Sequence, residues 1–376
     1  MTRIQGHILT PTGFVRGELI VDDTGHVAQV VGQPLSEAHV LDAALPIVIP
    51  GFIDLHVHGG GGCDVMDGDN AIATVASQHA RHGTTALLGT TMTAPIEDLE
   101  KAFAGLAGAC ANRAQRSARV LGVHLEGPYI SHEKLGAQPA FARPVIATEL
   151  ERLNALAPIR LITLAPEVSG NMDVIESLAA AGYRVQIGHT LASYDEAVKA
   201  LHKGAAGFTH LFNAMTGLHH RKPGAVGAAL AHAQYAEIIP DLVHVHPGAI
   251  RVALRAIPHL YCVTDSTAAA GMPDGDYQLG RQTVTKCLGG VRLADGTLAG
   301  STLTMDQALR NLVQKLGLGL VDASQRVSTN AANYLGATDR GRLQTGAWAD
   351  LVVLDRDLQI TDVYIEGISI EHAHAD

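Results

Sequence analysis

From about residue 47 onward, short apolar runs rich in β-branched residues alternate with longer segments of helical pattern. We expect eight of these runs to be strands, at residues 47–57, 85–91, 119–126, 159–165, 184–189, 207–211, 238–244 and 260–265. Strands that alternate with helices indicate a parallel sheet, and eight such units in succession fit a closed barrel better than an open sheet. The sequence therefore predicts an α/β protein built on a (β/α)8 TIM-like barrel.

The two ends of the chain follow a different pattern. Both contain short apolar runs separated by polar turns, as at residues 22–25, which is typical of β-hairpins. We predict that residues 1–50 and 346–376 form one small β-sandwich domain beside a barrel that spans residues 51–345. Two helix starts in the barrel also carry capping-box patterns, Thr148 with Glu151 and Ser193 with Glu196.

Charge and cysteine content narrow the class of protein. The chain has 27 Lys and Arg against 37 Asp and Glu, a net charge of −10 with neutral histidines. Without basic clusters it is not expected to bind nucleic acid, and without a long apolar run it is not expected to cross a membrane. Its cysteines are scattered and form no C-x-x-C pair, which predicts free thiols in a cytoplasmic protein. They are Cys63, Cys110, Cys262 and Cys287.

Histidine is unusually frequent, with 20 copies, and imidazole is the commonest metal ligand in proteins. In a (β/α)8 barrel the catalytic groups project from the carboxyl ends of the strands. His56 and His58 lie two residues apart on the first predicted strand, so both rings face the same side. The polar candidates at the predicted strand ends are His56, His58, Glu126, His189, His210, His244 and Asp265.

The chemistry of these side chains favours a metal-dependent hydrolase. Histidine and carboxylate ligands without cysteine suit Zn²⁺, Fe²⁺ or Mn²⁺. Such an ion lowers the pKa of bound water and polarises a carbonyl group. We expect Asp265 to take the proton of the water and pass it to the leaving group. Because an amine leaves only after protonation, this arrangement predicts hydrolysis of an amide-like bond.

Four sequence blocks carry a family resemblance, namely residues 50–59, 124–128, 209–215 and 263–271. In their order and spacing, over almost the whole chain, they resemble those of the N-acetylglucosamine-6-phosphate deacetylases of the amidohydrolase superfamily. The resemblance implies that Glu126, His189 and His210 are the metal ligands. It also implies that Asp265 is the catalytic acid and base.

The same resemblance implies a phosphosugar substrate. Asn213 and Ala214 match the pair that holds the sugar phosphate, and Arg221 matches the phosphate-binding arginine. In the family this arginine can come from the partner subunit of a dimer, so a homodimer is expected. His244 matches the histidine that contacts the substrate and helps to polarise its carbonyl, and residues 298–305 resemble the loop that lines the sugar pocket.

Two features leave the details open. Some family members lack the H-x-H pair and use one metal ion, whereas His56 and His58 permit a second ion bridged by Glu126. Gln138 stands where other members have a histidine that reaches the sugar, and glutamine can bond a hydroxyl but carries no charge. N-acetyl-D-galactosamine 6-phosphate is therefore an alternative substrate.

Two more distant alternatives are a cyclic-amide hydrolase and a barrel without catalysis. Enzymes of the first kind usually carry a bridging lysine, which the strand at 159–165 does not supply at its end. Intact His189, His210 and Asp265 argue against the second.

Overall fold

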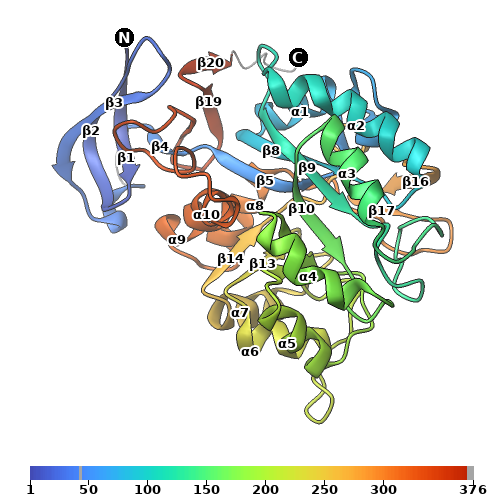
Figure 1. Ribbon diagram of the computed structural model, residues 1–376. Coiled ribbons are helices and arrows are strands. Elements are labelled where there is room, and N and C mark those ends of the chain that lie inside the picture. The colour runs from blue at the N-terminus through green and yellow to red at the C-terminus, as the bar shows by residue number, and fades with distance from the viewer. Residues whose placement is uncertain (42–44, 371–376) are drawn as a thin grey trace.

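In the computed structural model, which describes residues 1–41 and 45–370, the central part of the chain forms the predicted barrel (Figure 1). Six parallel strands are hydrogen-bonded in the order β12-β11-β10-β9-β8-β5, and β13 pairs in parallel with β14. The Leu211 amide donates to the Glu237 carbonyl at 3.0 Å, and that of Asp265 to the His56 carbonyl at 2.9 Å, which closes the ring. The barrel strands are β5 (Phe52–Val57), β8 (Thr84–Thr91), β9 (Arg119–Glu126), β10 (Ile159–Leu164), β11 (Arg184–Ile187), β12 (Gly207–Phe208), β13 (Tyr235–Ile238) and β14 (His259–Cys262).

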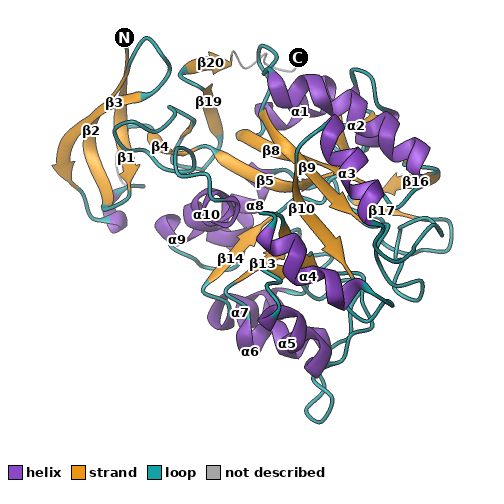
Figure 2. Ribbon diagram, viewed as in Figure 1, coloured by secondary structure: helices purple, strands orange, loops and turns teal. Residues whose placement is uncertain are grey.

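A helix follows each of the first seven barrel strands, and the helices lie outside the strands (Figure 2). After β14 the chain first forms a three-stranded antiparallel sheet and then a cluster of short α- and π-helical segments. No helix among the described residues is long and apolar enough to cross a lipid bilayer. The helices are α1 (Ala71–Arg81), α2 (Ile96–Ala111), α3 (Ala147–Leu156), α4 (Asn171–Ala180), α5 (Tyr194–His202), α6 (Gly224–His232), α7 (Pro247–Ala256), α8 (Met305–Arg310), η3 (Asn311–Lys315), α9 (Leu320–Ser324), η4 (Gln325–Thr329) and α10 (Asn330–Leu335), and the small sheet is β15 (Gly275–Leu279), β16 (Gln282–Cys287) and β17 (Gly290–Arg292).

Two predicted strands differ most from those in the structure, and the strands expected at 184–189, 207–211 and 260–265 end two or three residues early. The run 47–57 is divided into β4 (Ile47–Pro50), which pairs with strands of the terminal sheet, and the barrel strand β5. The strand expected at 238–244 instead spans Tyr235–Ile238 (β13). It ends there because Pro240 has no amide hydrogen and Asp241 begins a turn. The Asp241 carboxylate accepts the amides of Val243 and His244 at 2.9 and 2.8 Å, so His244 lies on a loop.

Strands from both ends of the chain form one sheet, which confirms the predicted β domain of both termini. Its order is β20-β19-β18-β4-β1-β2-β3. The domain limits at residues 50 and 346 stay a prediction, and the part of the second range after Ile370 lies outside the described residues. The remaining strands are β1 (Thr2–Thr10), β2 (Gly13–Val21), β3 (Val27–Pro34), β18 (Leu351–Leu354), β19 (Ile360–Ile365) and β20 (Ile368–Ile370), with short elements η1 (Glu37–His39), β6 (Gly59–Gly60), β7 (Cys63–Asp64) and η2 (Val65–Asp67) elsewhere.

Both faces of the terminal sheet are buried at β18, one of its inner strands. On β18, Val352 and Leu354 belong to the main core, which also contains the barrel, whereas Leu351 and Val353 belong to a second apolar cluster. Because successive side chains on a strand point to opposite faces, this alternation places one face of the sheet against the main core. The sheet is therefore packed against the barrel and also has a core of its own.

The two predicted capping boxes have different outcomes. Ser193 caps α5: its hydroxyl accepts the Glu196 amide at 3.3 Å, and the Glu196 carboxylate accepts the Ser193 amide at 2.8 Å. The box at Thr148 is wrong, because α3 already begins at Ala147 and its N-cap, Ile146, makes no side-chain cap. Thr148 lies within the first turn and is exposed to solvent.

Candidate metal centre and active site

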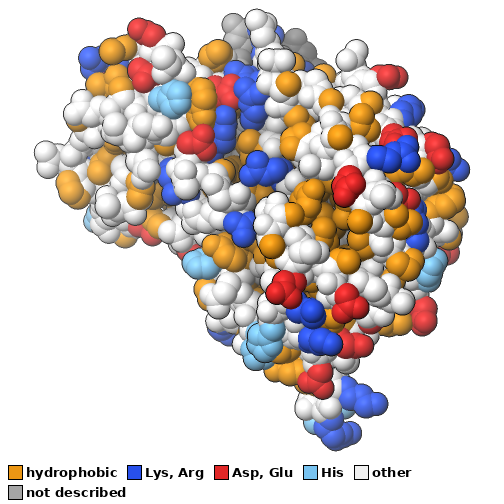
Figure 3. All heavy atoms as spheres, viewed as in Figure 1, with side chains coloured by type: hydrophobic (Ala, Val, Ile, Leu, Met, Phe, Trp, Pro, Cys, Tyr) orange, Lys and Arg blue, Asp and Glu red, His pale blue; other side chains and the backbone are white. Residues whose placement is uncertain are grey.

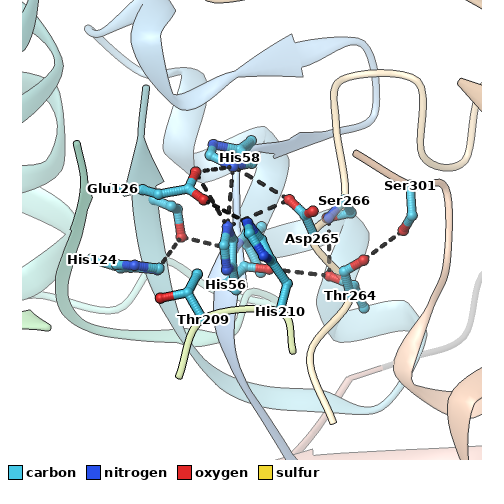
Figure 4. Close-up of polar contacts among 12 residues, drawn as sticks. His56, His58, His124, Glu126, Thr209, His210, Thr264, Asp265, Ser266 and Ser301 are labelled. Atoms are coloured by element: carbon cyan, nitrogen blue, oxygen red, sulfur yellow. Dashed lines mark hydrogen bonds and ion pairs between the residues drawn. The ribbon is translucent and has the colours of Figure 1, made fainter. Parts of the chain in front are cut away.

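The predicted strand-end residues lie close together in the structure, and Figure 4 shows five of them, namely His56, His58, Glu126, His210 and Asp265. His56 and His58 belong to the end of β5 and the residue after it, and Glu126 is the last residue of β9. His189, His210 and Asp265 follow β11, β12 and β14 within three residues. All six side chains are buried. Strands far apart in the sequence thus bring the five predicted metal ligands together with the predicted catalytic acid.

Three of these residues occupy an uncommon backbone conformation. The φ angles of His189, His210 and Asp265 are 46°, 27° and 51°. Residues with side chains rarely adopt positive φ, and such strain persists where the surrounding structure holds it, often at functional sites. The turn at each strand end is thus held in a conformation that aims its side chain into the common centre.

One group of ligands faces the cavity. Glu126 Oε1 lies 3.0 Å from His189 Nε2 and 3.1 Å from His210 Nε2, and the two nitrogens are 3.1 Å apart. His189 Nδ1 donates to the carbonyl of Lys134 at 2.8 Å, so in the neutral ring Nε2 carries the lone pair. A carboxylate oxygen and imidazole nitrogens that converge in this way form a suitable donor set for a divalent cation.

A second group consists of His56, His58 and Asp265. His58 Nε2 is 3.2 Å from His56 Nε2, 3.3 Å from Asp265 Oδ1 and 3.1 Å from Glu126 Oε2. His56 has no exposed surface and does not line the cavity. Glu126 therefore offers one oxygen to each group, which is the arrangement of a carboxylate that can bridge two ions.

The carboxylates of Glu126, Asp265 and Glu237 concentrate negative charge around His56 and stabilise its protonated form. Burial opposes protonation of His56, but the charges of Glu126, Asp265 and Glu237 outweigh it and raise its pKa well above the usual value. Burial likewise opposes protonation of His58, and its bonds with Asp265 and Glu126 raise its pKa to about 9. A divalent cation would neutralise the same carboxylates in place of the protons on the histidines, so the electrostatics also fit a metal centre.

Sequence reasoning missed Glu237, the residue that holds His56. His56 Nδ1 donates to Glu237 Oε2 at 3.0 Å, so in the neutral ring the Nε2 lone pair is directed at the centre. Glu237 lies inside β13, just before the range predicted for this strand. A charged residue within the apolar run 235–239 is the signal that would have found it.

Glu237 is fixed in turn by a chain of buried hydrogen bonds across the barrel interior. Gln186 donates to the Tyr261 hydroxyl at 2.6 Å, and that hydroxyl donates to Glu237 Oε1 at 3.4 Å. The chain begins at His124, in the sequence block 124–128, and reaches Gln186 through Thr163 and Thr209. Burial and the neighbouring His56 keep the pKa of His124 well below its usual value, so its ring is neutral.

A cavity of about 310 Å³ opens above the cavity-facing group. Asn213 and Ala214, which follow His210, line this cavity together with the predicted substrate contacts Gln138 and His244. His244 Nδ1 donates to Asp241 Oδ2 at 2.6 Å; burial opposes this ring's protonation, but the bond raises its pKa above the ordinary value. Leu298 and Gly300, from the loop predicted to line the sugar pocket, also border the cavity.

Gln138 has an unexpected contact within the cavity wall. Its Nε2 donates to Glu126 Oε2 at 2.6 Å, and its Oε1 accepts the backbone amide of Thr93 at 2.7 Å. Both ends of the amide are therefore engaged by the protein.

Apart from His56, Arg221 is the one predicted site residue that does not line the cavity of its own chain. It is exposed, and its side chain contacts the neighbouring His220 at 2.7 Å. The segment between β12 and α6 that carries it projects from the barrel at the bottom of Figure 1, and basic side chains gather at the tip in Figure 3.

Comparison with known proteins agrees with this geometry. The model of the amidohydrolase family matches residues 47–369. The chain belongs to this family. It is 37% identical to an N-acetylgalactosamine-6-phosphate deacetylase of Escherichia coli O157:H7, with 96% of each chain covered. It is 38% identical to an N-acetylglucosamine-6-phosphate deacetylase of Vibrio furnissii, over 92% of this chain and 89% of the relative.

A solved structure supports the same conclusion. A mutant of N-acetyl-D-glucosamine-6-phosphate deacetylase from Mycobacterium smegmatis, in complex with N-acetyl-D-glucosamine-6-phosphate, superimposes with a TM-score of 0.89. The two sequences are 34% identical, and the alignment covers 98% of each chain. The amidohydrolase fold of this chain therefore extends over its β domain as well as its barrel.

Proposed function

We propose that this chain is a metal-dependent deacetylase that hydrolyses N-acetyl-D-glucosamine 6-phosphate to D-glucosamine 6-phosphate and acetate. The observation that carries the proposal is the convergence of Glu126, His189, His210 and Asp265 at the floor of one cavity. Relatives of nearly the same length are phosphosugar deacetylases, which favours this activity over a cyclic-amide hydrolase or a barrel without catalysis.

The side chains around the cavity divide the work of amide hydrolysis. Glu126, His189 and His210 would hold a divalent ion, which would supply an acidified water and an electrophile for the amide carbonyl. The carboxylate of Asp265 takes the proton from the attacking water and later gives it to the nitrogen of the leaving sugar. His244, fixed by Asp241, is placed to donate a hydrogen bond to the amide oxygen as charge develops on it.

We propose Zn²⁺ as the ion, with Fe²⁺ and Mn²⁺ as the alternatives that the same nitrogen and oxygen ligands accept. The cavity-facing group supports one ion per subunit. The second group of His56, His58 and Asp265, with Glu126 between the two groups, supports a second ion. We also place the enzyme in the cytoplasm, because all four cysteines are free thiols, as in a reducing compartment.

Because the chain has a net charge of −10, its average field does not attract a phosphate, and donors close to the binding site must hold it. We propose that Asn213 and the backbone at Ala214 hold it on one side. Arg221 lies outside its own cavity on a projecting loop, so we propose that it reaches the cavity of the partner subunit in a homodimer.

Acetate release from three sugars tests the proposed reaction. We expect a high kcat/KM with N-acetyl-D-glucosamine 6-phosphate and a much lower one without the phosphate. Equal rates on both would contradict the phosphate argument. The E. coli relative and Gln138 favour N-acetyl-D-galactosamine 6-phosphate as the second candidate, and a higher kcat/KM on this epimer would establish it.

A mixing experiment tests the position of Arg221. Arg221→Ala and Asp265→Asn are each expected to be nearly inactive. If Arg221 acts across a dimer, subunit exchange between them creates mixed dimers with one intact site, and about a quarter of the wild-type activity returns. Mixtures that stay inactive although subunits exchange would show that Arg221 acts within its own chain.

A further inference from the structure

The amide of Gln138 is anchored in one orientation. The Thr93 backbone amide can only donate, so the Gln138 atom 2.7 Å from it is the oxygen. The nitrogen therefore faces Glu126 and donates to Oε2 at 2.6 Å. Gln138 is 5% exposed, and its own backbone amide donates to the Leu135 carbonyl at 2.8 Å within a turn. Gln138 is thus held by main-chain hydrogen bonds both at its side-chain oxygen and at its own backbone amide.

The two oxygens of Glu126 have different surroundings. Oε1 faces His189 and His210, the ligands on the cavity side, and Oε2 faces His58 and Gln138. A carboxylate can rotate about its last bond, which would turn either oxygen away from the histidines. The bond from Gln138 to Oε2 prevents this rotation and keeps Oε1 directed at the two imidazoles.

The same loop also orients a second ligand. The carbonyl of Lys134, four residues before Gln138, accepts His189 Nδ1 at 2.8 Å. Residues 134–138 thus contact two of the three cavity-facing ligands, one through the backbone and one through a side chain. Partners of this kind orient metal ligands, and their loss typically lowers metal affinity about 10–100-fold.

We propose that Gln138 is a positioning residue for the metal ligand Glu126, in addition to any contact with the sugar. Its amide connects the Thr93 main chain to the Glu126 carboxylate through two hydrogen bonds. The carboxylate is therefore held in its ligand orientation before the ion binds. The proposal rests on the proposed function only in that the site holds a divalent ion.

Metal binding without substrate tests this role. Apoprotein is titrated with Zn²⁺ and Co²⁺ in competition with a chromophoric chelator, for wild type, Gln138→Met and Gln138→Leu. Both variants lack the donor but differ in shape. We expect both to bind the ion about 10–100-fold more weakly and to alter the visible spectrum of the bound Co²⁺.

Gln282→Leu is the matched control. Gln282 donates to the carbonyl of Ala137 at 2.5 Å, so its loss disturbs the same loop without touching Glu126. We expect its metal affinity and Co²⁺ spectrum to equal those of the wild type.

Three results would overturn the proposal. They are unchanged metal affinity in both Gln138 variants, a loss with Leu alone that indicates packing, and an equal loss in Gln282→Leu. A raised KM for the phosphosugar with normal metal affinity would make Gln138 a substrate contact only. Absence of deacetylation by the metal-loaded wild type would contradict the proposed function but leave this role intact, since the affinities are measured without substrate.

Discussion

Asp265 contacts both histidines of the H-x-H pair and also lies at the cavity. Its Oδ1 lies 3.3 Å from His58 Nε2 and 3.4 Å from His56 Nε2, and the residue also borders the cavity. Burial raises the pKa of this carboxyl, but the two imidazoles outweigh it and lower the pKa below the usual value. The carboxylate is therefore ionised at neutral pH, as a general base must be before it accepts a proton.

Replacement of Asp265 by Asn should abolish turnover and leave the cavity-facing ligands in place. Asparagine keeps the size of the side chain and tolerates the φ of 51°, but it cannot accept the proton. We expect kcat to fall by at least about 10²–10⁴-fold, with phosphosugar binding and the ion at Glu126, His189 and His210 retained. Acetate release, elemental analysis and ligand titration measure these quantities. Substantial kcat in the variant would show that another group moves the proton.

At this scale the sequence can identify residues that follow a local rule. His189, His210 and Asp265 are predictable because each follows an apolar strand within three residues. Glu237 and the contact of Gln138 with Glu126 are not, because they depend on where side chains of different strands meet. His56 and Glu237 are 181 residues apart, and no local pattern indicates that they form a pair.

At the scale of secondary-structure elements, the starts of α3 and α5 show that the same sequence pattern forms a helix cap in one place and not in another. Ser193-x-x-Glu196 and Thr148-x-x-Glu151 are equivalent as patterns, but a cap requires a residue outside the helix in extended conformation. Ser193 meets this condition, with φ −66° and ψ 168°. Thr148 is already inside α3, so its hydroxyl cannot accept an amide of the first turn. The difference depends on where each helix begins, which sequence patterns define poorly.

The two threonine and serine positions give a matched pair of substitutions. Ser193→Ala removes the bond to the Glu196 amide and should lower the free energy of unfolding by about 0.5–2 kcal/mol. Thr148→Ala removes no cap and places a better helix former in α3, so the free energy should stay the same or rise slightly. Denaturant unfolding of both variants measures the difference. Equal losses would show that Ser193 contributes no more than any exposed hydroxyl.

Over the whole molecule, a cluster of charges connects the terminal sheet with the barrel. Glu366, in the turn between β19 and β20, accepts Arg113 Nε at 2.9 Å, Arg119 Nε at 2.8 Å and Arg340 at 2.7 Å. Arg113 and Arg119 belong to the segment between α2 and β9 and to the start of β9. The sequence predicted that both chain ends meet in one β domain, but not how this domain is attached, because the partners lie about 250 residues apart.

Glu366→Gln should therefore weaken the attachment of the β domain in a pH-dependent way. Burial opposes ionisation of Glu366, but its bonds with the three arginines lower its pKa from 4.5 to about 2. Because the folded-state pKa is the lower one, the carboxylate stabilises the fold above pH 4.5, and this contribution is lost as the pH falls toward 2. At pH 7 we expect Glu366→Gln to lower the free energy of unfolding by about 1–3 kcal/mol. The difference from the wild type should decrease as the pH falls from about 4.5 to about 2. Thermal unfolding over this range measures it, with Arg3→Gln as control, since the exposed pair of Arg3 with Glu18 should contribute less than about 1 kcal/mol. A pH-independent difference between Glu366→Gln and the wild type would show that the ionised carboxylate does not hold the domains together.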